Sequence, residues 1–470
     1  MTDNIRKLAN FFMLWFLLVA LTLGYWQVWA ADDLTNDSRI NRARLQEDAN
    51  LVQRGRILDR EGNVLAESRR EGDGWRRVYT KPELAHVTGF HSVRYGNSNL
   101  EDELNGYLRG AQGLTFRQAF DQKVLHKTVR GADVVATIDQ RLQAIADQQL
   151  GNRRGAVIAL EPNTGEILAL ASHPFFDPNA YEREAERLHG DNAAPLLNRA
   201  TQGLYVPGSA YKVVTYTGAL AAGATTPTTR YTDRDGRFVV DGFPITDRNH
   251  PGVEEFDAVH ALAYSCNVAF AQMGLTLGAE RLVEQSRAFG FGDAAPIEGL
   301  PTAPSQVQTQ PNFLAGKAGL ASTAFGQGQL LATPLQMALV AAAVANGGEV
   351  PIPRIYREIR SAEGQALHYP RSGVWRRAMD ERVASQVAQA MVVSVDEGWG
   401  KPAQIPGVKV AGKTGTGEVG AENQPNAWFI GFAPADQPRI AIAVVVERGE
   451  GGATTATPIA QRIMAAALGR

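Results

Sequence analysis

The stretch GVKVAGKTGTGEVG, residues 407–420, matches two sequence signatures that belong to different folds. Residues 407–414 fit the phosphate-loop pattern G-x-x-x-x-G-K-[ST], in which backbone N–H groups and the lysine hold a nucleotide phosphate. Residues 413–415 also spell Lys-Thr-Gly, a triplet that occurs in certain serine acyl-transfer enzymes. The flanking segments decide between the two interpretations, because a phosphate loop requires a strand before it and a helix after it.

Neither flank suits a phosphate loop. The preceding residues, KPAQIP (401–406), contain two prolines, which a central strand does not tolerate. The following residues, GTGEVGAENQPN (415–426), contain three glycines and a proline where a helix should begin. Residues 408–411, VKVA, alternate and include β-branched side chains, so they predict a strand. The context therefore favours a strand carrying Lys413 over a nucleotide site.

A second chemical feature is the run VPGSAYKVVT, residues 206–215, which contains Ser209 and Lys212. On a helix, residues three apart share a face, so this hydroxyl and this amine would be neighbours. Pro207 and Gly208 suit a helix start, which would place Ser209 near the positive end of the helix dipole. A lysine can activate a serine when burial and neighbouring cations lower its pKa. The alternative is an exposed helix start with a solvated lysine.

A third feature is YSCNVAF, residues 264–270, in which Ser265 and Asn267 lie two apart and can both face a cleft. Taken alone, this triplet is more often a polar loop residue or a helix cap than part of a catalytic site. Cys266 between them is interpreted as a small packing residue and not as a second nucleophile. The combination is more informative than any single triplet, because Ser-x-x-Lys, Ser-x-Asn and Lys-Thr-Gly each occur once and in that order.

This ordered set is characteristic of penicillin-binding proteins and class A β-lactamases. Over nearly its whole length the sequence resembles the class B penicillin-binding proteins, the monofunctional peptidoglycan transpeptidases. It looks most similar to the short division-associated or actinobacterial-type members. The resemblance is carried by RGRILDREGNVLA (54–66), NRATQGLYVPGSAYK (198–212), FGQGQLLATPLQMA (325–338), VAGKTGTGEVG (410–420) and AWFIGFAP (427–434).

The resemblance implies a role for each matching residue. Ser209 would be the acylated nucleophile, Lys212 its general base, and Ser265 a proton shuttle towards the leaving amine. The backbone N–H groups of Ser209 and Thr416 would hold the oxyanion. The substrate-binding residues would be Asn267, Lys413, Thr414, Gly415 and Thr416.

The implied reaction is peptidoglycan cross-linking through a serine acyl-enzyme, with release of D-Ala and inactivation by β-lactams. Three alternatives stay open: a D,D-carboxypeptidase, a β-lactamase or β-lactam sensor, and a cell-wall scaffold with an inactive catalytic domain. The implied partners are stem pentapeptides, as D-Ala-D-Ala donor and as amine acceptor, and a membrane-embedded glycan polymerase of the SEDS type.

From about residue 132 onwards, strand-like segments lie at both ends of the sequence and helical segments lie between them, which predicts an α+β fold. The residues around PNTG (162–165) predict a hairpin, and RGRILDREGNVLAES (54–68) predicts strand, turn and strand. The resemblance adds a five-stranded antiparallel sheet flanked by helices, an all-helical subdomain and a small, mostly β pedestal. The expected domains are a cytoplasmic tail (1–7), a transmembrane anchor (8–30), the pedestal (31–131) and the transpeptidase domain (132–470).

The anchor prediction rests on LANFFMLWFLLVALTLGYWQVWA, residues 8–30, 23 residues without a charge. As a helix it would span roughly 34 Å, enough for a bilayer core. A cleaved signal peptide is the alternative. We expect a single-pass protein of the cytoplasmic membrane with its catalytic domain on the extracytoplasmic side.

The composition narrows the function classes. A net charge of −2 over 470 residues shows no basic field for nucleic acid. The single cysteine excludes an intrachain disulfide, and the eight histidines show no zinc-binding spacing, so we expect no metal and no cofactor.

Overall fold

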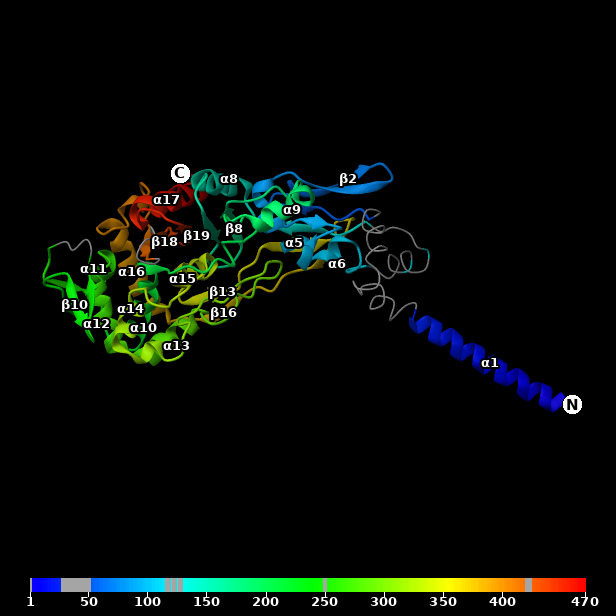
Figure 1. Cartoon of the computed structure of the whole chain (residues 1–470), viewed down its shortest axis with the longest axis horizontal. Helices are drawn as coiled ribbons and strands as arrows, with labels where there is room; N and C mark the ends of the chain where they lie inside the picture. Colours follow the sequence, from blue (N-terminus) through cyan, green and yellow to red (C-terminus); the bar gives the residue numbers. More distant parts are fainter. Residues whose placement is uncertain are drawn as a thin grey trace.

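The computed structural model describes residues 2–26, 52–114, 120, 125, 130–247, 252–418 and 425–470. Helix α1 (Thr2–Gly24) lies apart from an elongated body (Figure 1). Its segment Asp3–Gly24 is 22 residues long, apolar enough to cross a membrane, and not buried against the body. The predicted anchor at 8–30 therefore overlaps α1, and its last four residues lie outside the described part of the chain.

The centre of the body is a five-stranded antiparallel sheet in the order β17-β18-β19-β7-β8. Its strands are β7 (Gly155–Leu160), β8 (Ile167–His173), β17 (Ala411–Gly417), β18 (Asn426–Ala433) and β19 (Ile440–Val446). β7 and β8 form the predicted hairpin, and β19 pairs with β7, with Ala443 opposite Ile158. Strands from both ends of the domain thus share one sheet, and the predicted α+β fold is confirmed. The lysine-bearing strand begins at Ala411, three residues later than expected.

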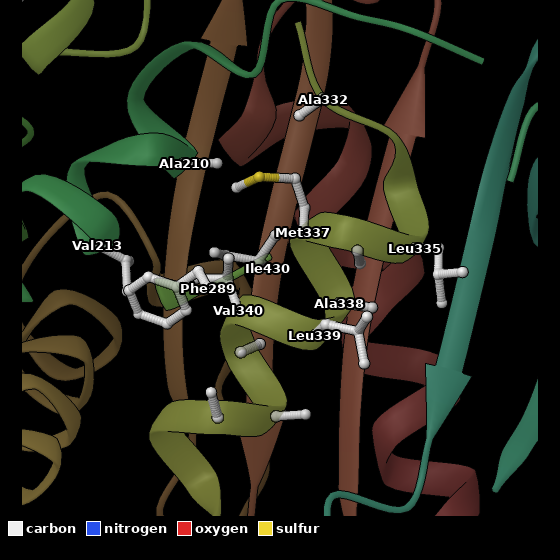
Figure 2. Close-up of a cluster of buried hydrophobic side chains, with 14 of the residues drawn as sticks. Ala210, Val213, Phe289, Ala332, Leu335, Met337, Ala338, Leu339, Val340 and Ile430 are labelled. Atoms are coloured by element: carbon white, nitrogen blue, oxygen red, sulfur yellow. The ribbon is translucent and has the colours of Figure 1, made fainter. Parts of the chain in front are cut away.

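Alternate side chains of these strands face two separate cores, as strand pleating requires. The core that contains Ile430 packs under helix α15 (Pro334–Ala345), whose side chains reach towards the sheet in Figure 2. The core that contains Phe429 lies against α8 (Gln140–Leu150) and α17 (Thr457–Ala467). α15 is apolar on every side and almost fully buried, because it runs between the sheet and the helical part of the domain.

Local capping signals explain where the helices begin. The Asp139 side chain accepts hydrogen bonds from two backbone N–H groups at the start of α8, and Gly151 ends that helix with φ +55°. The Thr333 hydroxyl caps α15, and Pro334 occupies its first turn. The other helices of the domain are α9 (Tyr181–Gly190), α10 (Lys212–Ala221), α11 (Ala258–Ala263), α12 (Asn267–Leu277), α13 (Ala279–Ala288), α14 (Lys317–Ala324) and α16 (Glu381–Asp396).

Short two-stranded sheets complete the part of the chain around the central sheet. They pair β9 with β12, β10 with β11, and β13 with β16. The hairpin of β10 and β11 lies at the end of the body farthest from α1 (Figure 1). Their bounds are β9 (Arg230–Thr232), β10 (Arg237–Val240), β11 (Phe243–Thr246), β12 (Glu255–Asp257), β13 (Glu349–Pro351) and β16 (Val374–Arg377).

The pedestal is built on a six-stranded sheet in the order β15-β14-β6-β1-β2-β3. Its strands are β1 (Ile57–Leu58), β2 (Val64–Glu71), β3 (Gly74–Tyr79), β6 (Asp133–Ala136), β14 (Tyr356–Arg360) and β15 (Ala366–His368). The predicted strand, turn and strand are present, and the Asp59 carboxylate holds the turn by accepting the N–H groups of Glu61 and Asn63 at 2.9 and 2.7 Å. Since β6, β14 and β15 come from beyond residue 131, this sheet crosses the predicted domain boundary.

A buried ion cluster fixes the pedestal helices to this sheet. The fully buried Glu101 carboxylate contacts Arg54 Nη2 and Arg77 Nε, each at 2.6 Å. Burial opposes its ionisation, but the two guanidinium groups lower the pKa of Glu101 to about 2. The charged segment 99–110 contains two short helices. The remaining pedestal elements are α4 (Ala85–Thr88), β4 (His91–Ser92), β5 (Gly96–Asn97), α5 (Asn99–Glu103) and α6 (Asn105–Leu108).

Candidate active site

Ser209 lies in a tight 3₁₀ turn, η3 (Gly208–Tyr211), that continues directly into α10. The turn is pressed against the edge strand β17, because a Cβ atom at Gly208 would lie 2.2 Å from the carbonyl oxygen of Thr416. Gly208 also has φ +54°, so glycine is required both by the space and by the backbone conformation. Ser209 itself is partly exposed, while its neighbours in the turn are buried. The turn therefore presents one hydroxyl from a rigid base.

Lys212, the first residue of α10, is fully buried. Its ammonium donates hydrogen bonds to the backbone oxygen of Ser265 at 2.5 Å and to the Asn267 Oδ1 at 2.8 Å. Within the described residues it makes no hydrogen bond to the Ser209 hydroxyl. Burial lowers the pKa of Lys212 to about 8, against the opposing effect of the Asp247 charge. An amine with this pKa is partly neutral near neutral pH, as a general base requires.

Ser265 occupies the sharp turn between α11 and α12, with φ +62°. Its hydroxyl accepts hydrogen bonds from both lysines, from Lys413 Nζ at 2.8 Å and from Lys212 Nζ at 3.3 Å. A hydroxyl has two acceptor lone pairs and one proton, so two donors leave its own proton available. The three sequence triplets, which are far apart in the chain, therefore meet at this one oxygen.

Lys413 comes from β17 and is also fully buried. Burial, together with the charge on Lys212, lowers the pKa of Lys413 well below its ordinary value. Its ammonium also donates to the Thr414 carbonyl at 2.9 Å. The strand thus places the amine behind the surface, whereas Thr414, Gly415 and Thr416 line the cleft in front of it.

These residues border a cleft of about 1160 Å³ that contains Ser209. Its lining includes Asn267 and aromatic side chains, among them Tyr264 and Trp399. The lining also includes Thr416 and residues of α14 and of the loop after it, among them Gln327. The predicted site residues on the cleft surface are Ser209, Ser265, Asn267, Thr414, Gly415 and Thr416.

The sequence did not indicate the carboxylates that surround Cys266. The Cys266 thiol is buried and donates to Asp233 Oδ2 at 3.1 Å and to Asp247 Oδ2 at 3.2 Å. Burial and the Asp247 charge raise the pKa of Cys266, which suits a neutral thiol and not a nucleophilic thiolate. The three groups lie within 4.8 Å of one another, so they could offer three ligands to a divalent cation. The expectation of no metal rested on the spacing of the histidines. That spacing cannot reveal a group of ligands such as these, which lie far apart in the sequence and meet only in the folded chain.

Comparison with known proteins identifies the family. Residues 155–465 match the penicillin binding protein transpeptidase domain, and residues 54–134 match the penicillin binding protein A dimerisation domain. This chain is a class B penicillin-binding protein. The first match contains all three triplets, and the second ends at Val134 in β6, near the boundary predicted at residue 131.

Curated and solved relatives of this penicillin-binding protein agree with that assignment. The peptidoglycan D,D-transpeptidase PbpA of Mycobacterium tuberculosis is 35% identical over 500 residues, covering 100% of this chain and 99% of the relative. The penicillin G acyl-enzyme complex of M. tuberculosis penicillin-binding protein A superposes with a TM-score of 0.80 at 35% identity, covering 89% of this chain and 100% of that one. A more distant relative, MrdA of Acinetobacter baumannii, is 32% identical over 70% of this chain and 52% of its own length.

Proposed function

We propose that this penicillin-binding protein is a peptidoglycan D,D-transpeptidase that works through an acyl-enzyme on Ser209. The observation that carries the proposal is the shared hydrogen bonding of Lys212 and Lys413 to the Ser265 hydroxyl, in the cleft that the partly exposed Ser209 also lines. This arrangement supplies a nucleophile, a base of lowered pKa and a proton carrier within one site. The full-length similarity to PbpA supports the same reaction.

In the acylation step, neutral Lys212 takes the proton of the Ser209 hydroxyl. The serine oxygen then attacks the carbonyl carbon between the two D-Ala residues of the donor stem. The backbone N–H groups of Ser209 and Thr416 hold the resulting oxyanion, an interaction whose removal typically costs ~2.7–4 kcal/mol in the barrier. The carbon–nitrogen bond breaks, and the leaving D-Ala nitrogen receives a proton relayed from Lys212 through Ser265.

The terminal carboxylate of the donor would bind along β17, at Thr414, Gly415 and Thr416. Burial and the Lys212 charge lower the pKa of Lys413, which disfavours its charged form. A bound carboxylate would favour the ammonium form instead, because an opposite charge at short range raises a lysine pKa. Lys413 would therefore gain its full positive charge together with the substrate. Asn267, held by Lys212, would bind the donor amide.

In the second step, an amine from a neighbouring stem attacks the acyl-enzyme. The amine loses a proton, the Ser209 oxygen leaves and regains a proton, and a new peptide cross-link forms. A β-lactam opened by Ser209 keeps its leaving nitrogen attached, so the acyl-enzyme persists. The D,D-carboxypeptidase alternative differs only in using water in this step, and the β-lactamase alternative requires fast hydrolysis of the same intermediate.

The chain is a membrane-anchored protein by the length and composition of α1 and by its relatives. We place residues 1–7 in the cytoplasm, the anchor at 8–30, the pedestal at 31–131 and the transpeptidase domain at 132–470 on the extracytoplasmic side. A SEDS-type glycan polymerase would contact the anchor and the pedestal, because cross-linking must follow glycan synthesis at the membrane surface.

Intact mass of the full-length protein in detergent, after incubation with benzylpenicillin, tests the proposal. We expect one stable adduct of one drug mass, which Ser209→Ala abolishes. Ser322→Ala is the matched control, because Ser322 also lines the cleft but donates only to the backbone oxygen of Gly319. An adduct that survives Ser209→Ala would contradict the assignment of the nucleophile, and rapid drug destruction without an adduct would favour the β-lactamase. A donor pentapeptide offered with and without an amine acceptor then separates transfer from hydrolysis.

A further inference from the structure

The loop between α14 and α15 sends one polar side chain into the active-site cleft. Gln327 lines the cleft, and its Nε2 atom donates a hydrogen bond to the carbonyl oxygen of Thr416 at 3.1 Å. The loop itself is anchored, since the backbone N–H of Gln327 donates to the Ser322 oxygen at 3.0 Å. The end of α14 is tied to α10 by the Thr215 hydroxyl, which donates to Ala324 O at 2.7 Å. The amide of Gln327 is therefore presented from a rigid base.

Three backbone segments meet beside this side chain. A Cβ atom at Gly326 would lie 1.8 Å from the carbonyl oxygen of Gly208, and one at Gly208 would lie 2.2 Å from the carbonyl oxygen of Thr416. The Ser209 turn is thus enclosed between the loop at Gly326 and the strand β17. Backbone segments packed with no room for a Cβ atom transmit small displacements to one another, because there is no void into which they can relax. Gln327 is the side-chain link across the same junction.

The orientation of the Thr416 N–H and C=O groups determines what the hydrogen bond from Gln327 does. β17 is an edge strand of the central sheet, paired on one side with β18. In an antiparallel strand, the N–H and C=O groups of one residue point to the same side. The Thr416 carbonyl points to Gln327 and Gly208, away from β18, so the Thr416 N–H also points away from β18, towards the Ser209 turn.

We propose that Gln327 is a positioning residue for the oxyanion, an inference that rests on the proposed function above. By holding the Thr416 carbonyl, its amide sets the rotation of Thr416 and so aims the Thr416 N–H at the developing negative charge. An oxyanion donor acts only when it is aligned before the reaction, so this alignment contributes to the transition state and not to substrate binding. Gln327 touches no reacting atom in this role.

Gln327→Met tests the proposal, because methionine has similar length and no N–H donor. We expect the acylation rate constant k2 for benzylpenicillin to fall roughly tenfold, the effect of losing one hydrogen bond to a part-buried carbonyl. The dissociation constant of the non-covalent complex should stay within about twofold. Gln327→Glu keeps the shape of the side chain but turns a carboxylate oxygen towards the Thr416 carbonyl, so it should lose at least as much activity. This second variant keeps the test valid if Gln327→Met folds poorly.

A boronic acid inhibitor separates oxyanion positioning from a merely structural role. When the Ser209 oxygen adds to boron, the tetrahedral adduct places one of its oxygens where the oxyanion would be. Its affinity should fall in parallel with k2 in Gln327→Met, at an unchanged melting temperature. Gln329→Met is the matched control, because Gln329 lies on the same loop but away from the cleft. Its Oε1 atom accepts hydrogen bonds from the backbone N–H groups of Thr309 and Gln310 and from the Thr309 hydroxyl. It should leave k2 and boronate affinity unchanged.

All measurements use the full-length protein in detergent. Unchanged k2 and boronate affinity in Gln327→Met would overturn the proposal. A fall in k2 that accompanies an equal loss of non-covalent affinity and of melting temperature would also overturn it, because that pattern describes general unfolding. Wild-type protein that forms no adduct at Ser209 would instead refute the proposed function, so the two failures are distinguishable.

Discussion

The buried environment of Lys212 predicts a specific pH dependence for acylation. Burial lowers the pKa of this lysine from its ordinary value of 10.5 to about 8. Only the neutral amine can take the Ser209 proton, so the rate should rise with pH until the lysine is deprotonated. With a pKa of about 8, the neutral fraction is about 9% at pH 7 and about 91% at pH 9, a roughly tenfold rise that flattens above pH 8. An unshifted lysine would give a rise of roughly 100-fold over the same interval, with no flattening.

The assay is stopped-flow acylation by benzylpenicillin between pH 6 and 9, at constant ionic strength, with the melting temperature recorded at each pH. Ser322→Ala serves as a control with an unchanged profile, since it leaves the lysines and Ser265 untouched. A rate that continues to rise tenfold per pH unit up to pH 9 would refute the argument that burial makes Lys212 the base. A rate that does not change with pH would refute any role for a titrating base in this step.

Three substitutions test the packing around the site and the pedestal. Gly326→Ala should reduce acylation more than tenfold and destabilise the fold by about 1–3 kcal/mol, because its Cβ would clash with the carbonyl of Gly208 at 1.8 Å; Gly223→Ala, at φ +66° with open space, should leave acylation intact. Glu101→Gln should cost about 3–5 kcal/mol in chemical denaturation, because it leaves two buried arginines without their counter-charge, and no change in stability would contradict this. Leu339→Ala should lower the free energy of unfolding by about 2–5 kcal/mol, since Leu339 is fully buried in α15. A loss below about 1 kcal/mol would contradict this, because it would mean that neighbouring side chains fill the cavity left by Leu339.

Much of the secondary structure was predictable because local chemistry sets it. The turn at 161–166 follows from its Pro-Asn-Thr-Gly residues, and Asp139 and Gly151 mark the ends of α8. The β17 prediction was right in kind but began too early, because β-branched residues before Ala411 suggested a longer strand. The Ser209 turn was expected to be regular helix and is 3₁₀, since Gly208 with positive φ shapes its entry.

The pedestal illustrates a limit of reasoning along the chain. Its sheet takes β14 and β15 from residues 356–368, and nothing in those residues indicates which partner strand they will join. Strand pairing depends on shape and register between surfaces, which are properties of the assembled fold. We expected a contiguous boundary at residue 131, and the sheet extends across it.

The sequence by itself determined the three triplets, their order and the family to which they belong, because these depend on residue type and short spacing. Only the tertiary structure decided that two lysines share the Ser265 hydroxyl, that burial moves the pKa of Lys212 to about 8, and that Gln327 reaches Thr416. Those properties arise from contacts between segments 50 to 150 residues apart and from the exclusion of water around them. No local pattern encodes them, since burial belongs to the folded chain as a whole.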